Sequence, residues 1–202
     1  MTQPHEHNIT ALFQRSLHTK QAVADSDAPQ IIAQMAQTIS HCIEQGGKLL
    51  LCGNGGSAAD AQHLAAELVV RLRPHINRQA LPALSLSIDS SFMTACANDY
   101  AFDDVFARAL AALGRRGDVL LGISTSGNSA NVIKAFSQAQ TMNITTCALL
   151  GSGGGKMKQM ADFQYIVPDD ETGRIQEAHI MLGHALMETI EDILSAHGYL
   201  HE

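Results

Sequence analysis

Short apolar runs that end near glycine or serine alternate along the chain with segments of helical composition. Each run is too short for a helix and continuous enough to be buried on both faces, as strands of a parallel sheet are. Five runs are predicted as strands, at residues 48–52, 83–88, 118–123, 145–150 and 163–167. Because parallel strands are joined by helical crossovers, the pattern predicts an α/β fold: a doubly wound, five-stranded parallel sheet flanked by helices.

Both ends of the chain have helical periodicity. Residues 1–46 carry no strand signal, and their apolar residues recur at helical spacing, which predicts two helices before Gly46. Residues 174–196 predict one long C-terminal helix that is apolar on more than one side. No linker or repeat interrupts the chain, so a single domain over 1–202 is expected. Within this domain, residues 47–202 are expected to form the α/β core and the C-terminal helix, and residues 1–46 are expected to pack against other subunits.

Composition excludes several classes of protein. The chain is 46% hydrophobic and 16% charged, which is too apolar for disorder, and no run approaches the roughly 18 to 20 apolar residues of a membrane span. A net charge of −7 without a basic stripe argues against direct nucleic-acid binding. The four cysteines form no CxxC pair and no signal sequence precedes them, so buried thiols in a reducing cytoplasm are expected.

The first predicted strand is followed by a glycine-rich loop, residues 53–57, that opens a helix. Backbone N–H groups in such a loop can receive an anion or sugar hydroxyls. The loop also matches the GxGxxG/A dinucleotide fingerprint, but no acidic residue ends a second strand about 20 residues on. The alternative without a ligand is a helix cap, with Ser57 at the N-cap and Asp60 completing a capping box.

A second loop, Ser-Thr-Ser-Gly-Asn-Ser at 124–129, follows the third predicted strand and precedes a helix that begins near Ala130. A helix cap needs one hydroxyl and this loop supplies four, which favours a phosphate ligand over simple capping by Ser129. Neither loop carries the lysine of a Walker motif, so nucleotide hydrolysis is disfavoured. A third glycine cluster at 151–155 has no assigned role.

Histidine and carboxylate side chains follow on two helices. His63 and Glu67 stand at i and i+4, hence on one helical face among apolar neighbours, where they can share a metal or a substrate. On the last helix, Gln176 and His184 are eight residues apart, about 12 Å along the axis. One compact metal site could use both only if their side chains converge, and otherwise one of them serves a neighbouring subunit. His179 lies off their face and is expected in solvent.

These residues resemble the sugar isomerase (SIS) domains and, within them, the bacterial phosphoheptose isomerases. The resemblance runs through nearly the whole chain and is carried by 52–60, 62–67, Arg71, 97–100, 117–133 and 174–177 with His184. It implies a cytoplasmic homotetramer, with sites at subunit interfaces, that converts sedoheptulose 7-phosphate to D-glycero-D-manno-heptose 7-phosphate for surface polysaccharide, including the lipopolysaccharide core.

The resemblance also implies the roles of individual residues. The substrate-binding set is Asn54, Gly55, Gly56, Ser57, Glu67, Arg71, Asn98, Asp99, Ser124, Thr125, Ser126, Ser129 and Gln176. The implied zinc ligands are His63, Glu67, Gln176 and His184. The chain departs from the family pattern at Leu150-Gly151 and at Gly173, which bears on substrate fit more than on the type of reaction.

Aldose–ketose isomerisation moves a proton between two carbons through an enediol, so it needs a base, an acid at the carbonyl oxygen and an anchor for the phosphate. The expected base is Glu67, and the expected acid is His184. Three other functions stay open. The first is a non-catalytic adapter like the DnaA-initiator-associating protein, whose kind lacks the glutamate and histidine kept here. The second is a sugar-phosphate sensor, and the third is a nicotinamide dehydrogenase.

Overall fold

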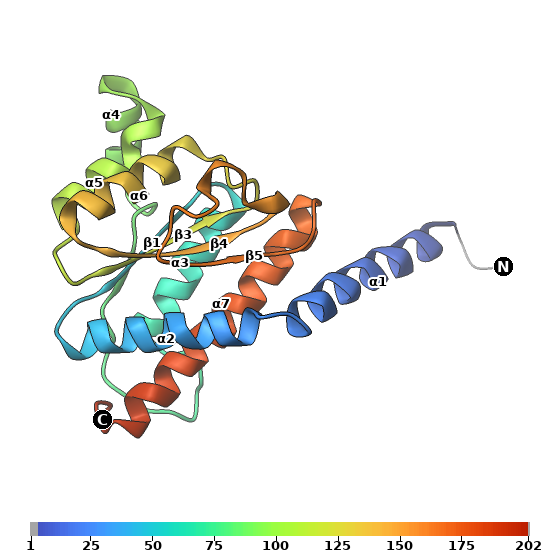
Figure 1. Ribbon diagram of the computed structural model, residues 1–202, viewed down its shortest axis with the longest axis horizontal. Coiled ribbons are helices and arrows are strands. Elements are labelled where there is room, and N and C mark those ends of the chain that lie inside the picture. The colour runs from blue at the N-terminus through green and yellow to red at the C-terminus, as the bar shows by residue number, and fades with distance from the viewer. Residues whose placement is uncertain (1–3, 202) are drawn as a thin grey trace.

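Figure 1 shows a computed structural model, which describes residues 4–201, so the outermost residues of the predicted 1–202 domain lie outside it. The five predicted strands form one parallel sheet in the order β2-β1-β3-β4-β5, as expected for a doubly wound fold. The strands are β1 (Leu49–Gly53), β2 (Ala83–Ser85), β3 (Val119–Ser124), β4 (Thr145–Leu150) and β5 (Phe163–Ile166). The chain adds β2 on one side of β1 and β3 on the other, so the switch point of the sheet lies between β1 and β3.

The second strand ends three residues earlier than the prediction of 83–88. It is an edge strand that pairs with β1 only from Leu49 to Leu51, and Leu86 N–H makes the last bond, of 2.8 Å, to the carbonyl of Leu51. Beyond that point β1 continues against β3 alone, so residues 86–88 have no neighbouring strand on which to extend.

Helices cover both faces of the sheet (Figure 1). They are α1 (Pro4–Ala24), α2 (Ala28–Glu44), α3 (Gly56–Val69), α4 (Ser90–Asp99), η1 (Phe102–Asp104), α5 (Val105–Leu113), α6 (Ala130–Met142), η2 (Ser152–Met157) and α7 (Thr172–Ala196). The two N-terminal helices and the long C-terminal helix are therefore confirmed. Within residues 4–201 no helix has the length and apolarity needed to cross a membrane.

Alternate side chains of each central strand enter two separate hydrophobic clusters. In β1, Leu49 and Leu51 pack with α2, α3 and α7, whereas Leu50 and Cys52 pack with α5 and α6. Each fully buried leucine contributes roughly 1.5 to 3 kcal/mol to the free energy of unfolding. The runs are continuously apolar because both faces are covered, which is the pattern that identified them as strands.

His179 on α7 lies inside the protein, so the expectation that it faces solvent is wrong. Its side chain is 1% exposed, and Nε2 donates a 3.0 Å hydrogen bond to the carbonyl of Leu150 at the end of β4. Because α7 packs against α2, α3 and the sheet, the part of its surface that carries His179 is covered as well. Burial lowers the pKa of His179 from 6.5 to about 4, against the raising effect of the Leu150 bond.

The buried imidazole predicts acid-sensitive folding. The unfolded chain binds a proton to His179 near pH 6.5 and the folded chain near pH 4, so stability is full above this window and falls as the pH drops through it. Between pH 7 and pH 5 this group alone lowers the free energy of unfolding by about 2 kcal/mol. The free energy of unfolding is measured by urea denaturation at pH 7 and at pH 5. In H179Q, the difference between the two values is expected to be about 2 kcal/mol smaller than in wild type. The exposed His75 supplies a control, H75Q, which keeps the wild-type difference. If the free energy of unfolding falls by the same amount between pH 7 and pH 5 in wild type and H179Q, His179 is not the cause of the acid sensitivity.

Candidate active site

Two loops meet at the carboxyl edge of the sheet, on either side of the switch point. The first joins β1 to α3 and the second joins β3 to α6, and the parallel pairing of β1 with β3 brings them together. The carboxamides of Asn54 and Asn131 exchange two hydrogen bonds of 2.8 Å, which tie the first loop to the first turn of α6. Open sheets of this kind bind ligands at this edge, in the crevice at the switch point.

The first loop opens α3 without a side-chain cap. Gly55 occupies the N-cap position with φ of +56°, which favours glycine, and no side chain bonds to the helix start. The alternative in which Ser57 and Asp60 cap this helix is therefore wrong. Ser57 lies inside the first turn, where it is buried and its N–H donates to the carbonyl of Asn54. The exposed part of the loop is Gly55 and Gly56, with Asn54 half-buried beside them.

The second loop has hydroxyls on its outer side and hydrogen bonds within it. Ser124 and Ser129 join through their Oγ atoms at 3.0 Å, and Gly127 N–H donates to Ser124 Oγ at 3.1 Å. Ser126 is exposed and Thr125 half-buried. Ser129 stands at the N-cap of α6, but its hydroxyl makes no capping bond to the helix. The start of this 13-residue helix can therefore receive an anion together with the loop hydroxyls.

The third glycine cluster supports the second loop, a role that its sequence did not indicate. Met157 N–H donates to the carbonyl of Gly127 at 2.9 Å, and Lys156 N–H donates to Asn128 Oδ1 at 3.1 Å. Gly127 has φ of +61°, and a Cβ at that position would collide with the backbone of Gly154. A Cβ at Gly155 would in turn stand 2.5 Å from the carbonyl oxygen of Ser126, so the two loops pack backbone to backbone through glycines.

His63 and Glu67 on α3 meet His184 on α7. Their ligand atoms lie within 4.8 Å of one another, with 2.8 Å between the two histidine Nε2 atoms and 3.3 Å from His63 Nε2 to Glu67 Oε1. Gly183 makes this possible, because a Cβ there would stand 2.6 Å from the side chain of Leu64. The glycine lets α7 approach α3 one residue before His184 and one residue after His63.

The donor set of this cluster fits a catalytic zinc ion. Two imidazole nitrogens and one carboxylate oxygen, with a further position open, form a ligand set that zinc enzymes use. Among the described residues, no hydrogen bond joins Gln176, the fourth implied ligand, to His63, Glu67 or His184. Its amide lies against Gly56 instead, 2.5 Å from where a Cβ of that residue would stand. The structure therefore brings three of the four implied ligands together and sets Gln176 beside the first loop.

Asp60 belongs to the same helical face and was considered only as a cap. Its Oδ2 atom is buried and has no hydrogen-bond partner. Burial raises the pKa of this carboxyl, while the nearby His63 and His184 act to lower it. Positions 60, 63 and 67 follow the i, i+3, i+7 spacing of one helical stripe, a signal that identifies Asp60 as part of the site.

Three predicted substrate residues lie apart from the loops. Asn98 and Asp99 end α4, are exposed, and bond to each other at 2.8 Å. Arg71 follows the end of α3 and is exposed. In the described chain no hydrogen bond or ion pair joins any of them to either loop or to the His63 cluster.

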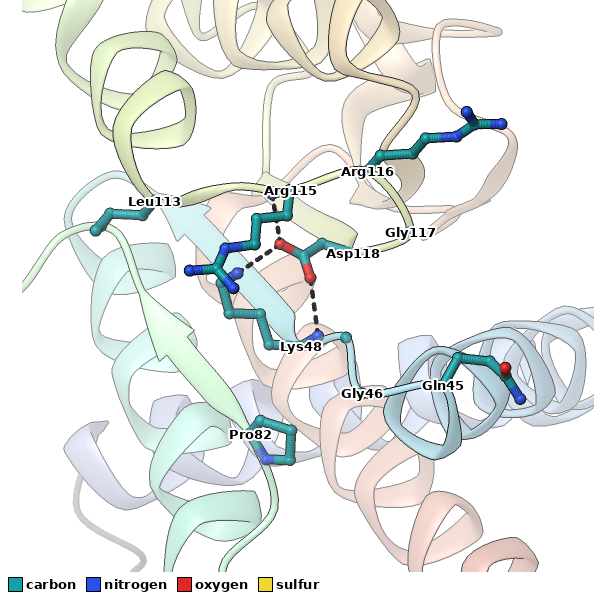
Figure 2. Close-up of a pocket in the computed structure, with 10 residues that line it drawn as sticks. Gln45, Gly46, Lys48, Pro82, Leu113, Arg115, Arg116, Gly117 and Asp118 are labelled. Carbon is teal, nitrogen blue, oxygen red and sulfur yellow. Dashed lines mark hydrogen bonds and ion pairs between the residues drawn. The ribbon is translucent and has the colours of Figure 1, made fainter.

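A cavity of about 520 Å³ lies at the opposite edge of the sheet, where β1 and β3 begin (Figure 2). Asp118, which is 2% exposed, accepts hydrogen bonds there from the backbone and ammonium of Lys48 and from the backbone of Arg115. The bonds from Lys48 link the turns that start the two strands, and the bond from Arg115 closes the turn before β3. The residues that line this cavity therefore hold the strands together. The polar loops lie at the other end of the strands.

The packing of the second loop generates a stability prediction. Gly127→Ala forces a backbone collision and a disfavoured φ, so its Tm is expected to fall by several degrees, equivalent to about 2 kcal/mol or more. Gly173→Ala is the matched control, because a Cβ there meets nothing within 4 Å, and its Tm should stay within about a degree of wild type. Equal melting temperatures of the two variants, measured by calorimetry, would show that the loops are not packed in this way.

Comparison with known proteins agrees with this geometry. The family model for the SIS domain matches residues 13–151. A phosphoheptose isomerase from Chlorobaculum parvum is 52% identical over 180 residues, which cover 89% of this chain and 86% of that one. One from Helicobacter pylori is 51% identical over 80% of this chain and 83% of its own.

Solved structures give the same result. The phosphoheptose isomerase GmhA from Neisseria gonorrhoeae has a TM-score of 0.86 and 44% identity, with coverage of 93% of this chain and 98% of that one. A phosphoheptose isomerase from Francisella tularensis has a TM-score of 0.89 and 37% identity, with coverage of 95% and 100%. From its sequence, its fold and its relatives, the chain belongs to the SIS-domain family and, within it, to the phosphoheptose isomerases.

Proposed function

We propose that this chain interconverts sedoheptulose 7-phosphate and D-glycero-D-manno-heptose 7-phosphate by proton transfer through an enediol, for heptose of the lipopolysaccharide core. Relatives named phosphoheptose isomerase, about half identical over most of the chain, support the reaction class. The observation that carries the proposal is the meeting of Glu67 with His63 and His184 across two helices. An adapter or a sensor needs no such group of proton carriers.

Glu67 is the proposed base. Its side chain is 15% exposed, so a substrate carbon can reach it while most water is excluded. A carboxylate held in a fixed position beside the reacting carbon converts proton transfer into a step within the complex. His184, on the facing helix, is the proposed acid that exchanges a proton with the substrate oxygens.

The second loop is the proposed phosphate anchor. The hydroxyls of Ser124, Thr125, Ser126 and Ser129 surround the uncapped start of α6, and an anion there gains from the helix dipole. Asn54, Gly55, Gly56 and Gln176 border this edge and are proposed to contact the sugar. Ser57 has the weakest support in that set, because it is buried and its N–H is already bonded.

Zinc is the proposed metal, held by His63, Glu67 and His184, with Gln176 as a fourth ligand only if its amide leaves Gly56. When bound, zinc would polarise the substrate carbonyl and stabilise the negative charge that develops on oxygen. A carboxylate that coordinates a metal is a weaker base. Glu67 Oε1 faces His63, and its second oxygen forms no hydrogen bond in the described chain, which leaves that oxygen free to take the proton.

We also propose that the active enzyme is a cytoplasmic homotetramer whose sites are completed between subunits. Ile9, Phe13 and Leu17 form an exposed apolar stripe on α1, with Phe13 65% exposed, on a helix that extends to one side of the molecule (Figure 1). An apolar groove of about 360 Å³ between α2 and α7, lined by Ile32 and Met181 among others, could receive such a stripe from a second copy.

The distance between the first loop and the proposed base within one chain also supports a site that is completed by a second subunit. Glu67 is eleven residues beyond Gly56 on α3, about 16 Å along the helix axis. The exposed residues Asn98, Asp99 and Arg71 are proposed to approach the sugar site of a neighbouring subunit.

The four cysteines are free and buried, which supports the proposed location in a reducing compartment, the cytoplasm.

Removal of the base tests the reaction. In E67Q, the turnover of sedoheptulose 7-phosphate followed by NMR is expected to fall at least 10²-fold, with an unchanged Tm, because the amide cannot accept the proton. Q62E, an exposed change on the same helix, is the control and should keep wild-type turnover. Treatment of wild type with a chelator, followed by return of zinc, measures the metal requirement in the same assay.

Each outcome has a distinct meaning. Near-normal turnover in E67Q would remove Glu67 from the mechanism. Turnover that is indifferent to the chelator would keep the isomerase and discard the zinc. A wild type that is stabilised by the sugar phosphate without turnover would favour the sensor, and capture of a replication initiator by E67Q would favour the adapter.

The apolar stripe predicts the oligomeric state. F13S/L17S is expected to sediment as a smaller species than the wild-type tetramer in analytical ultracentrifugation, because two large apolar contacts per chain are lost. Q14S, at an exposed polar position on the same helix, should leave the tetramer intact. A wild-type monomer, or a tetrameric F13S/L17S, would contradict this use of α1.

A further inference from the structure

Arg78 and Glu191 form an ion pair inside the protein, away from the reacting groups. The side chains of Arg78 and Glu191 are 0% and 1% exposed, and Arg78 Nε donates to Glu191 Oε1 at 2.7 Å. The second oxygen of Glu191 accepts a 2.8 Å bond from Arg73 Nε. Both carboxylate oxygens therefore have guanidinium partners.

The remaining nitrogens of Arg78 bind the end of α3. One terminal nitrogen donates to the carbonyl of Leu68 at 2.8 Å and to that of Gln79 at 3.0 Å, and the other donates to the carbonyl of Glu67 at 2.8 Å. The last carbonyls of a helix have no partner within the helix. Arg78 supplies that partner at the residue proposed as the base.

Glu191 is fixed to the other half of the site. It stands seven residues after His184 on α7, two helical turns away and on nearly the same face. The guanidinium of Arg78 thus connects the backbone of Glu67 to the helix that carries His184. The contact of Leu64 with Gly183 lies on the opposite side of Glu67 along α3.

We propose that Arg78 and Glu191 are positioning residues that set the separation of Glu67 from His184 across α3 and α7. This inference rests on the proposed function, since it assigns the pair a role in the same proton transfer. A guanidinium is suited to this task because its planar fork donates in several fixed directions at once.

Stability alone is a poor explanation for the pair. A buried ion pair loses hydration that its attraction only partly restores, and replacing both partners with apolar residues of similar volume is often neutral or stabilising. Removing one partner leaves an uncompensated buried charge and is strongly destabilising. The double substitution therefore separates positioning from folding.

The test compares R78M/E191L with wild type under saturating sedoheptulose 7-phosphate. The expected result is a Tm within a few degrees of wild type, a kcat at least 10-fold lower and a KM within about 3-fold, because misplacement of the base affects the transition state more than binding. Hydrogen exchange at the Val70 amide, which closes the last turn of α3, should be at least 10-fold faster. R73M is the control, since it removes a guanidinium from Glu191 but leaves Arg78 on α3, and it should keep the wild-type kcat.

A folded R78M/E191L with wild-type kcat would overturn the proposal, as would an equal loss of kcat in R73M. If the double variant does not fold, R78K replaces it. Lysine keeps the charge for Glu191 without the fork, so its kcat is expected to fall, and a wild-type value would overturn the proposal. A wild type without turnover refutes the proposed function instead, and unchanged exchange at Val70 then refutes the tie itself.

Discussion

The parallel pairing of β1 with β3 is the contact on which the remainder of the structure depends. It places two parallel strands side by side whose following helices, α3 and α6, cover opposite faces of the sheet, so the two loops lie next to each other at one edge. At the other edge Asp118 holds the starts of both strands through backbone and ammonium bonds. Between these ends, alternate leucines pack into two hydrophobic clusters, which hold the strands in place. The loops that follow the strands therefore start from fixed positions.

Helices arrange the side chains of the proposed proton transfer, His63, Glu67 and His184. Glycine at 183 allows α7 to contact α3 closely, and each helix then presents its polar stripe to the other. Precision of this kind is difficult to obtain from loops, whereas helices packed on a sheet move little. The proposed phosphate end of the site is thus built from loops, and the proposed proton-transfer end from packed helices.

Strands and helices could be predicted from the sequence because local patterns determine them. The continuous apolar run predicted as a strand at 118–123 forms β3 one residue later, buried on both faces. Contacts between distant residues could not be predicted from these local patterns, and the meeting of His63 with His184 was implied only by the family resemblance. The burial of His179 depends on the end of β4, and the tie from Arg78 joins residues 113 positions apart. Asp60 looked like part of a cap because it stands three residues after Ser57, although its Oδ2 atom is buried without a hydrogen-bond partner.

The four cysteines have a practical consequence. They lie on α2, β1, α4 and β4, all are free and buried, and burial raises the pKa of Cys52 and Cys147 to about 12. A thiolate is the form that reacts with alkylating reagents, and it is scarce in the folded chain. Each thiol is therefore a built-in reporter of local opening, and the rate at which it is alkylated measures how often its own element separates from the core.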